Sequence, residues 1–201
     1  MNFINRILLT YWKNLIKEID SYREKPVQVQ RSVFEYLVKN GSDTAFGHQH
    51  HFSDIKGYEE FRKNVPVRDY NSLSPFIERA RSGEKYVLWN QEVPWYAKSS
   101  GTSADKSKFI PITPENLKNC HYKGFQTLMA SYINTHRESK LFYGKSLTLG
   151  GSVKPENAGG ISYYTGDLSA VLLQNSPKVV EWVRVPSKKT ALLHDFNEKN
   201  L

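Results

Sequence analysis

The sequence predicts an α/β fold in which a helical N-terminal region precedes a mixed sheet with helices. Before residue 86, apolar side chains recur mainly at helical spacing, and after it short runs rich in β-branched and aromatic residues appear. A long helical segment interrupts those runs, and helices mixed with strands are typical of α/β architecture. The 201 residues are 39% hydrophobic and 13% aromatic, which is enough apolar material for a core.

The N-terminal region is expected to form two helices. Apolar residues from Phe3 to Ile19 recur at steps of three and four, which predicts a first helix with a single apolar stripe. Packing against the body of the protein explains this stripe, and a basic helix on a membrane surface is the alternative. Pro26 opens the second helix, which is expected to stop before Gly41.

Residues 41–54 (GSDTAFGHQHHFSD) are expected to form a loop. Ser53 or Asp54 is placed to cap a short helix after it, and a further helix is expected over residues 73–83. The histidines in HQHH are the only cluster of this kind in the sequence. Because zinc sites need several converging ligands of defined spacing, we expect no protein-bound metal.

Short strands are expected from residue 86 onward. The candidate runs are YVLW, VPWYA, KFIPI, SLTLG, ISYYT and AVLLQ. Between them, Thr113 is placed to cap a long helix that has Pro114 in its first turn and extends to about Thr135. The C-terminal segment is expected to be helical on both sides of Pro186.

Charge and cysteine content restrict the function classes. The net charge is +8, from 28 basic and 20 acidic residues, but the basic residues are scattered and no nucleic-acid-binding signature is present. We therefore expect a solvated basic surface and no nucleic-acid partner. No apolar run is long enough to cross a bilayer, so no transmembrane segment is expected. The single Cys120 fits a reducing, cytoplasmic location and is expected to be buried and inert.

Residues 99–108 (SSGTSADKSK) are the candidate ligand-binding segment. They connect two expected strands, at a place where ligands of α/β sheets gather. Glycine allows close approach of the backbone to an anion, hydroxyl and backbone N–H groups donate to it, and a following lysine suits a phosphate. The segment lacks the GxxxxGK[ST] spacing of a Walker P-loop and the dinucleotide fingerprint GxGxxG. Composition alone also allows a polar surface loop.

The segment and its flanks resemble one enzyme family. SSGTS followed by lysine is similar to the phosphate-binding motif of adenylate-forming ligases. The longer form, SSGTS with lysine and FIP, resembles the Gretchen Hagen (auxin-responsive promoter) family of acyl-acid amido synthetases, in particular its bacterial branch. Residues 44–84 resemble the family before the motif, and CHYKGF, LTLGGS and GDLSAVLLQN resemble it afterwards. The resemblance covers nearly the whole chain.

This resemblance implies an ATP-dependent ligase. In the family, ATP and a carboxylic acid form an acyl-adenylate and pyrophosphate, and an amine, usually of an amino acid, then displaces AMP to form an amide. ATP, with Mg as its counter-ion, is the implied cofactor. The motif carries a phosphate-binding role over to Ser99, Ser100, Gly101, Thr102, Ser103 and Lys108. Lys106 lies nearby and competes with Lys108 for this role.

The resemblance also implies a binding region for the acid. The helix after Thr113 would border the acyl pocket, and a glycine turn would lie near the site. The candidate substrate-binding residues are His121, Tyr122, Phe125, Gly150, Gly151 and Ser152. Core packing explains the aromatic residues equally well, and a plain turn at a strand end explains the glycines. In this family context His50 is a structural loop residue.

Later motifs of the family are not recognisable in the sequence. The ribose-binding motif, the Tyr-Arg-x-Gly-Asp type motif and the mobile C-terminal domain are missing. Residues 1–201 are therefore expected to be the N-terminal part of the large adenylation domain, as a truncation or a split gene product, and to be inactive alone. The missing C-terminal portion is then a candidate partner. The alternative is a non-catalytic remnant or partner subunit that binds a nucleotide or phosphate.

Overall fold

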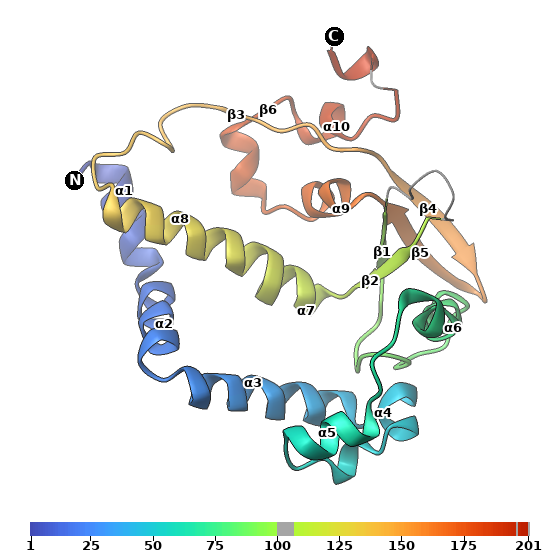
Figure 1. Cartoon of the computed structure of the whole chain (residues 1–201). Coiled ribbons are helices and arrows are strands. Elements are labelled where there is room, and N and C mark those ends of the chain that lie inside the picture. Colours follow the sequence, from blue (N-terminus) through green and yellow to red (C-terminus); the bar gives the residue numbers. More distant parts are fainter. Residues whose placement is uncertain (100–106, 196, 201) are drawn as a thin grey trace. The chain divides into compact units, whose positions relative to one another are not determined.

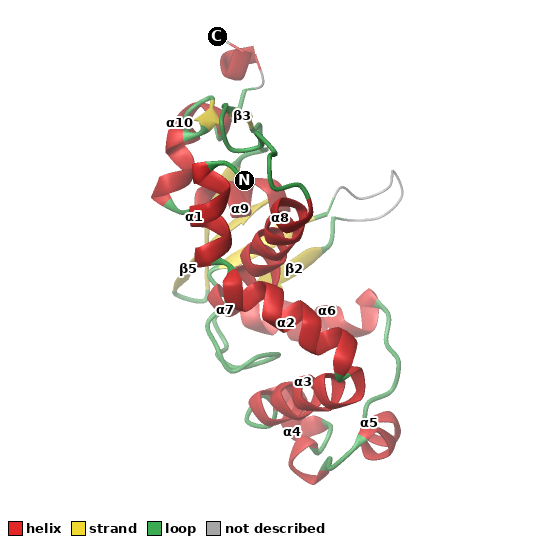
Figure 2. Ribbon diagram, turned by 90° about the vertical axis from the view of Figure 1, so that its left-hand side faces the viewer, coloured by secondary structure: helices red, strands yellow, loops and turns green. Residues whose placement is uncertain are grey.

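Helices and two sheets make up the computed structural model, which describes residues 1–99, 107–195 and 197–200 (Figures 1 and 2). The α/β class is therefore as predicted. The chain divides into two units. The first unit comprises Met1–Glu24, Pro114–Lys154 and Gly166–Leu201, and the second comprises Lys25–Thr113 and Pro155–Thr165.

The helices of the second unit are α3 (Pro26–Gly41), α4 (Ala45–Gln49), α5 (Tyr58–Asn64) and α6 (Tyr70–Arg81), with the 3₁₀ helix η1 (Phe52–Asp54). The prediction of a loop over residues 41–54 was wrong. Thr44 caps α4 there, because its hydroxyl accepts a hydrogen bond from the N–H of Gly47 at 2.9 Å. The residue that precedes α5 is Gly57, and not Ser53 or Asp54.

The larger sheet has the strand order β2-β1-β5-β4 in the described residues. Its strands are β1 (Trp95–Lys98), β2 (Phe109–Ile112), β4 (Val153–Ala158) and β5 (Ile161–Gly166). Strands β1 and β2 are antiparallel, with Trp95 opposite Ile112. The buried core against this sheet consists of Ile77, Tyr96 and Tyr163, and the two tyrosine rings meet edge to face. The run YVLW, expected to be a strand, is irregular, and β4 was not predicted.

The first unit contains the helices α1 (Phe3–Tyr11), α2 (Lys13–Glu24), α7 (Pro114–Asn116), α8 (Lys123–Thr135), α9 (Leu168–Gln174) and α10 (Lys188–Ala191). A π-helical turn, η2 (Leu117–Tyr122), joins α7 to α8, so the long helix predicted after Thr113 is continuous. Short segments complete the unit: β3 (Ser146–Leu147), β6 (Arg184–Val185), η3 (Lys178–Trp182) and η4 (Asn197–Asn200).

The N-terminal stripe is not one helix. Trp12 lies between α1 and α2 and buries its side chain against Ala130 and Ile133 of α8. Because the helix axis is interrupted there, Phe3 and Tyr11 are left on the exposed side of α1. Among the described residues, no helix combines the length and apolar character that a bilayer crossing requires.

Of three further predictions for this unit, two were wrong and one was confirmed. The run AVLLQ forms α9 and not a strand, because Asp167 caps this helix by accepting from the N–H of Ala170 at 2.9 Å. The C-terminal segment is helical on both sides of Pro186, as expected, in the short elements η3 and α10, and β6 before Pro186 pairs in parallel with β3. Cys120 is exposed and not buried.

Candidate functional site

The candidate ligand-binding segment closes the hairpin formed by β1 and β2. The N–H of Ser99 donates to the carbonyl oxygen of Lys108 at 2.9 Å, and the N–H of Lys108 donates to Ser99 Oγ at 3.2 Å. These bonds continue the antiparallel register in which Lys98 lies opposite Phe109. The two ends of the predicted motif are therefore held together. Ser100, Gly101, Thr102, Ser103 and Lys106 lie outside the described residues.

Helix α6 begins next to the second end of this segment. Lys108 is exposed, and its ammonium lies 5.6 Å from the centroid of the Tyr70 ring. The hydroxyl of Tyr70 accepts from the N–H of Phe109 at 2.8 Å. Asp69 caps α6 by accepting from the N–H of Ser72 at 2.8 Å and from its hydroxyl at 2.5 Å. These bonds hold the pKa of Asp69 below its usual value, and the charge of Lys108 adds a smaller effect in the same direction.

The other end of α6 contacts the same strand. The guanidinium of Arg81 lies 3.9 Å from the centroid of the Phe109 ring, as in a cation–π contact. Arg81 Nη1 donates to both carboxylate oxygens of Glu78 at 2.9 Å, and Nη2 donates to the hydroxyl of Tyr163 at 3.3 Å. Helix α6 therefore contacts Phe109, the residue after Lys108, at both its main chain and its ring.

The candidate acid-binding residues lie in the first unit. His121 and Tyr122 belong to the π-helical turn η2, a kind of turn that is frequent at functional sites. The hydroxyl of Tyr122 donates to the carbonyl oxygen of Leu172 in α9 at 2.9 Å, and burial raises the pKa of this tyrosine. His121 is half-buried, whereas Phe125 is 59% exposed, so core packing does not explain Phe125.

The glycine turn lies against the beginning of α9. A Cβ atom at Gly151 would overlap the carboxylate of Asp167, so any larger residue there would have to displace this carboxylate. Burial raises the pKa of Asp167, but hydrogen bonds from Ser169, from the backbone of Ala170 and from that of Gly151 outweigh it, and the pKa is lower than usual. Asp167 therefore ties the turn to the helix.

The side chain of Lys199 contacts the same glycine turn. Nζ of Lys199, which is buried, donates to the carbonyl oxygens of Gly150 at 2.5 Å and Gly151 at 3.4 Å. Ser152, the next residue, is half-buried. The structure thus brings Tyr122, Gly150 and Gly151 together around α9.

His50 has a structural role in the second unit. Its ring is buried, Arg68 Nη2 lies 3.0 Å from Nε2, and Nδ1 lies 2.6 Å from the carbonyl oxygen of Asn64. Because a guanidinium only donates, Nε2 is the acceptor and Nδ1 carries the proton. Both ring nitrogens are therefore engaged by the protein. In the described residues, no group of three or more His, Cys, Asp or Glu side chains is arranged to hold a metal ion.

Several contact residues were missed from the sequence. Asp69 carried a usable signal, since an Asp three residues before a Ser and ahead of an apolar run is typical of a helix start. Asp167 carried the same kind of signal before Ala170. Tyr70 and Lys199 contact residues distant in the sequence, and no local pattern marks them.

The chain has the fold of part of a solved acyl acid amido synthetase. It superposes on a structure of the GH3.15 acyl acid amido synthetase with a TM-score of 0.72 at 19% identity, over 95% of this chain and 32% of that one. The model of the "GH3 family N-terminal domain" matches residues 15–200, and the chain belongs to the GH3 family.

Relatives in this family are much longer than the chain. Indole-3-acetic acid-amido synthetase GH3.17 of Arabidopsis thaliana is 28% identical over 132 residues, which are 64% of this chain and 22% of that protein. Jasmonoyl–L-amino acid synthetase JAR4 of Nicotiana attenuata is 20% identical over 176 residues, which are 87% of this chain and 30% of that protein. The chain therefore spans less than a third of the length of these relatives.

Proposed function

We propose that this chain supplies the phosphate-binding part of an ATP-dependent acyl acid amido synthetase of the bacterial branch of the family. The observation that carries the proposal is the β1–β2 hairpin, whose connecting segment has the family's SSGTS and lysine and whose ends, Ser99 and Lys108, are bonded to each other. Membership of the GH3 family supports it.

The proposed reaction has two steps. A carboxylate oxygen of the acid attacks the α-phosphorus of ATP, the bond from this phosphorus to the pyrophosphate oxygen breaks, and pyrophosphate leaves. An amine, usually of an amino acid, then attacks the acyl carbon, AMP leaves, and the nitrogen loses a proton. The first step needs donors and cations around oxygens that gain negative charge. A relative is named for indole-3-acetic acid, and a solved relative carries 2,4-DB, so a small organic acid is the proposed substrate class.

The described residues suit a phosphate group at the hairpin. Lys108 offers an exposed ammonium, and Ser99 offers a hydroxyl at the same place. We assign ATP, with Mg as its counter-ion, to the segment that begins at Ser99 and ends at Lys108. The proposed contacts are Ser99, Ser100, Gly101, Thr102, Ser103 and Lys108. For the acid, we assign His121, Tyr122, Phe125 and the turn formed by Gly150, Gly151 and Ser152.

We also infer that residues 1–201 are the N-terminal part of the large adenylation domain in a cytoplasmic enzyme. The later motifs and the small mobile domain would come from another stretch of polypeptide, the candidate partner. The short share of each relative that the chain spans supports this inference. Without those parts nothing closes over the intermediate, so we expect no turnover by the chain alone.

A thermal-shift titration with MgATP and with pyrophosphate tests the binding. A ligand that binds only the folded state at 100 times its Kd stabilises it by about 2.7 kcal/mol. We expect a clear shift for the wild-type chain, a much smaller shift for Lys108→Met, and a normal shift for Lys56→Met, which removes the same charge elsewhere in the second unit. The absence of any shift in the wild-type chain would overturn the proposal.

Pyrophosphate exchange separates an enzyme part from a non-catalytic remnant. The chain alone should give no acid-dependent exchange, and exchange by it would contradict the inferred inactivity. Adding the C-terminal portion of a family member should restore exchange if the chain is part of an enzyme. Binding without any restored exchange would favour the remnant.

A further inference from the structure

The ammonium of Lys108 rests on an aromatic ring. It lies 5.6 Å from the centroid of Tyr70, the first residue of α6. Two other lysines, Lys85 and Lys123, form ion pairs with glutamates at 2.8 and 2.5 Å. For Lys108, no described carboxylate lies within 4.0 Å. Asp69 is near enough for the charge of Lys108 to lower its pKa, but the two side chains form no ion pair, so Lys108 rests on the Tyr70 ring without a directly bonded carboxylate.

An aromatic ring and a carboxylate have different effects on a cation that must bind an anion. The ring attracts an ammonium through its quadrupole and leaves the full positive charge available on the opposite side. A carboxylate would attract it more strongly but would cancel the charge and compete with an incoming phosphate. Asp69 is adjacent to Tyr70, and its Oδ1 is occupied by the N–H and hydroxyl of Ser72.

Tyr70 also fixes the strand on which Lys108 sits. Strand β2 lies at the edge of the sheet, and the N–H of Phe109 donates to the Tyr70 hydroxyl at 2.8 Å. Arg81 holds the ring of Phe109 at 3.9 Å from the far end of the same helix. The main chain next to Lys108 is thus immobilised by α6, and the ring of Tyr70 receives the lysine's charged end.

We propose that Tyr70 is a positioning residue for anion binding: its ring holds the ammonium of Lys108, still charged, at the base of the hairpin before an anion arrives. This inference rests on the proposed function and deepens it. A free lysine side chain loses rotamer freedom when it binds a ligand, and a lysine that is already held loses less. The benefit of Tyr70 should therefore depend on the presence of Lys108.

Nuclear magnetic resonance of the unliganded 201-residue chain, with its lysines labelled with ¹³C at the ε carbon, tests directly whether the charged end of Lys108 lies over the Tyr70 ring. The ring current of Tyr70 should shift the ε-methylene signal of Lys108, which is assigned by its loss in Lys108→Met. Tyr70→Phe, which keeps the ring, should retain the shift, and Tyr70→Leu should abolish it. An unchanged signal in Tyr70→Leu would overturn the inference.

A double-mutant cycle then tests the consequence for binding. Tyr70→Leu should weaken the affinity for pyrophosphate by about three- to tenfold, the cost of ordering one lysine side chain. In the Lys108→Met background the same substitution should have no further effect, because the group that Tyr70 positions is gone. A merely structural role would weaken binding equally in both backgrounds, which would refute the proposal. Tyr70→Phe, which keeps the ring but loses the hydroxyl that accepts from the N–H of Phe109, should weaken binding less than Tyr70→Leu, and a loss equal to that of Tyr70→Leu would contradict the role of the ring.

The failures of the two proposals are distinguishable. If the wild-type chain binds pyrophosphate, Lys108→Met weakens binding and Tyr70→Leu does not, then the role of Tyr70 is wrong and the proposed function stands. If the wild-type chain binds neither pyrophosphate nor MgATP, the proposed function is wrong, and the positioning role is wrong with it.

Discussion

The turn between β4 and β5 allows a matched pair of substitutions. Gly159 and Gly160 both have positive φ angles, +58° and +78°. A Cβ atom on Gly159 would overlap the carbonyl group of Ser82, the residue that ends α6, whereas a Cβ atom on Gly160 would have nothing within 4 Å. Alanine at either position is therefore strained, but only alanine at 159 also collides with backbone.

The structure gives a magnitude for each variant. An L-residue in the left-handed region costs about 1–2 kcal/mol, which is the expected loss of unfolding free energy for Gly160→Ala. Gly159→Ala has the same cost and adds an overpacking cost of about 1–3 kcal/mol, because main-chain atoms cannot rotate away as a side chain can. We therefore expect Gly159→Ala to be less stable than Gly160→Ala by about 1–3 kcal/mol.

Urea denaturation followed by circular dichroism measures both variants against the wild type. The midpoint should fall further for Gly159→Ala than for Gly160→Ala. Because Ser82 ends the helix that carries Tyr70, Gly159→Ala should also weaken pyrophosphate binding more than its neighbour does. Equal destabilisation by the two variants would refute the packing of this turn against Ser82.

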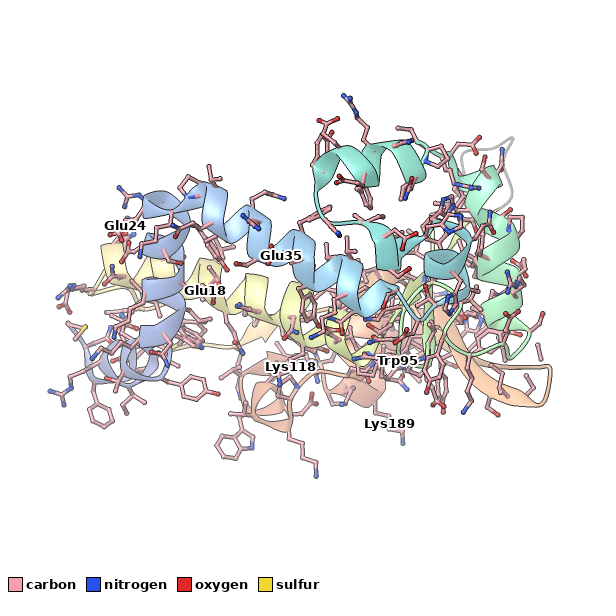
Figure 3. The ribbon with its side chains drawn as sticks, turned by 90° about the horizontal axis from the view of Figure 1, so that it is seen from below. Glu18, Glu24, Glu35, Trp95, Lys118 and Lys189 are labelled. Carbon is pink, nitrogen blue, oxygen red and sulfur yellow. The ribbon has the colours of Figure 1, made fainter. Side chains whose placement is uncertain are left out.

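Other predictions concern buried or bonded polar groups. Burial raises the pKa of Glu18 on α2 (labelled in Figure 3), but hydrogen bonds from Lys123 and Tyr22 outweigh it, and the pKa lies below the ordinary 4.5. This carboxylate's stabilisation is thus present above about pH 4.5 and lost as the pH falls through the folded pKa, so the stability difference between wild type and Glu18→Gln should shrink in acid melts. The hydrogen bond to Glu18 raises the pKa of Tyr22 to about 12, and absorbance at 295 nm should show it titrating nearer 10 in Glu18→Gln. Tyr96 is fully buried and its hydroxyl has no hydrogen-bond partner among the described residues, so Tyr96→Phe should stabilise by about 1 kcal/mol. Tyr163→Phe, which removes a bonded hydroxyl, should destabilise by about 1 kcal/mol in the same urea assay, and the opposite order would contradict the assignment.

Elements with local start signals were predicted well. Thr113 and Pro114 predicted the long helix, and the apolar runs on either side of the polar segment predicted β1 and β2, although their antiparallel pairing was not predicted. Elements decided by a single contact were not. AVLLQ suits a strand or a helix equally by composition, and the cap at Asp167 selects the helix. The break after Tyr11 follows from burial of Trp12 against α8, which is distant in the sequence.

In the candidate site, too, features with a local sequence signal differ from features that depend on contacts distant in the sequence. The phosphate-binding role of the 99–108 segment was predicted from its residue types together with the family resemblance, and it stays a prediction. The contact between Tyr70 of α6 and Lys108 could not be predicted, because the rest of α6 and all of β1 separate these two residues in the sequence. Local sequence therefore proposes which groups bind, and contacts that are distant in the sequence determine how those groups are held.

If the chain binds pyrophosphate without turnover, as proposed, the role of Lys108 is measurable in two parts. The effect of Lys108→Met on the pyrophosphate affinity of the chain then reports only ground-state binding. The equivalent substitution in a full-length family enzyme changes kcat/KM, which reports stabilisation of the transition state relative to the free enzyme and substrates. If the second effect exceeds the first, the lysine acts more strongly on the charge that develops during adenylation than on bound phosphate. If the two are equal, its contribution is uniform binding, and the acceleration must come from groups other than Lys108.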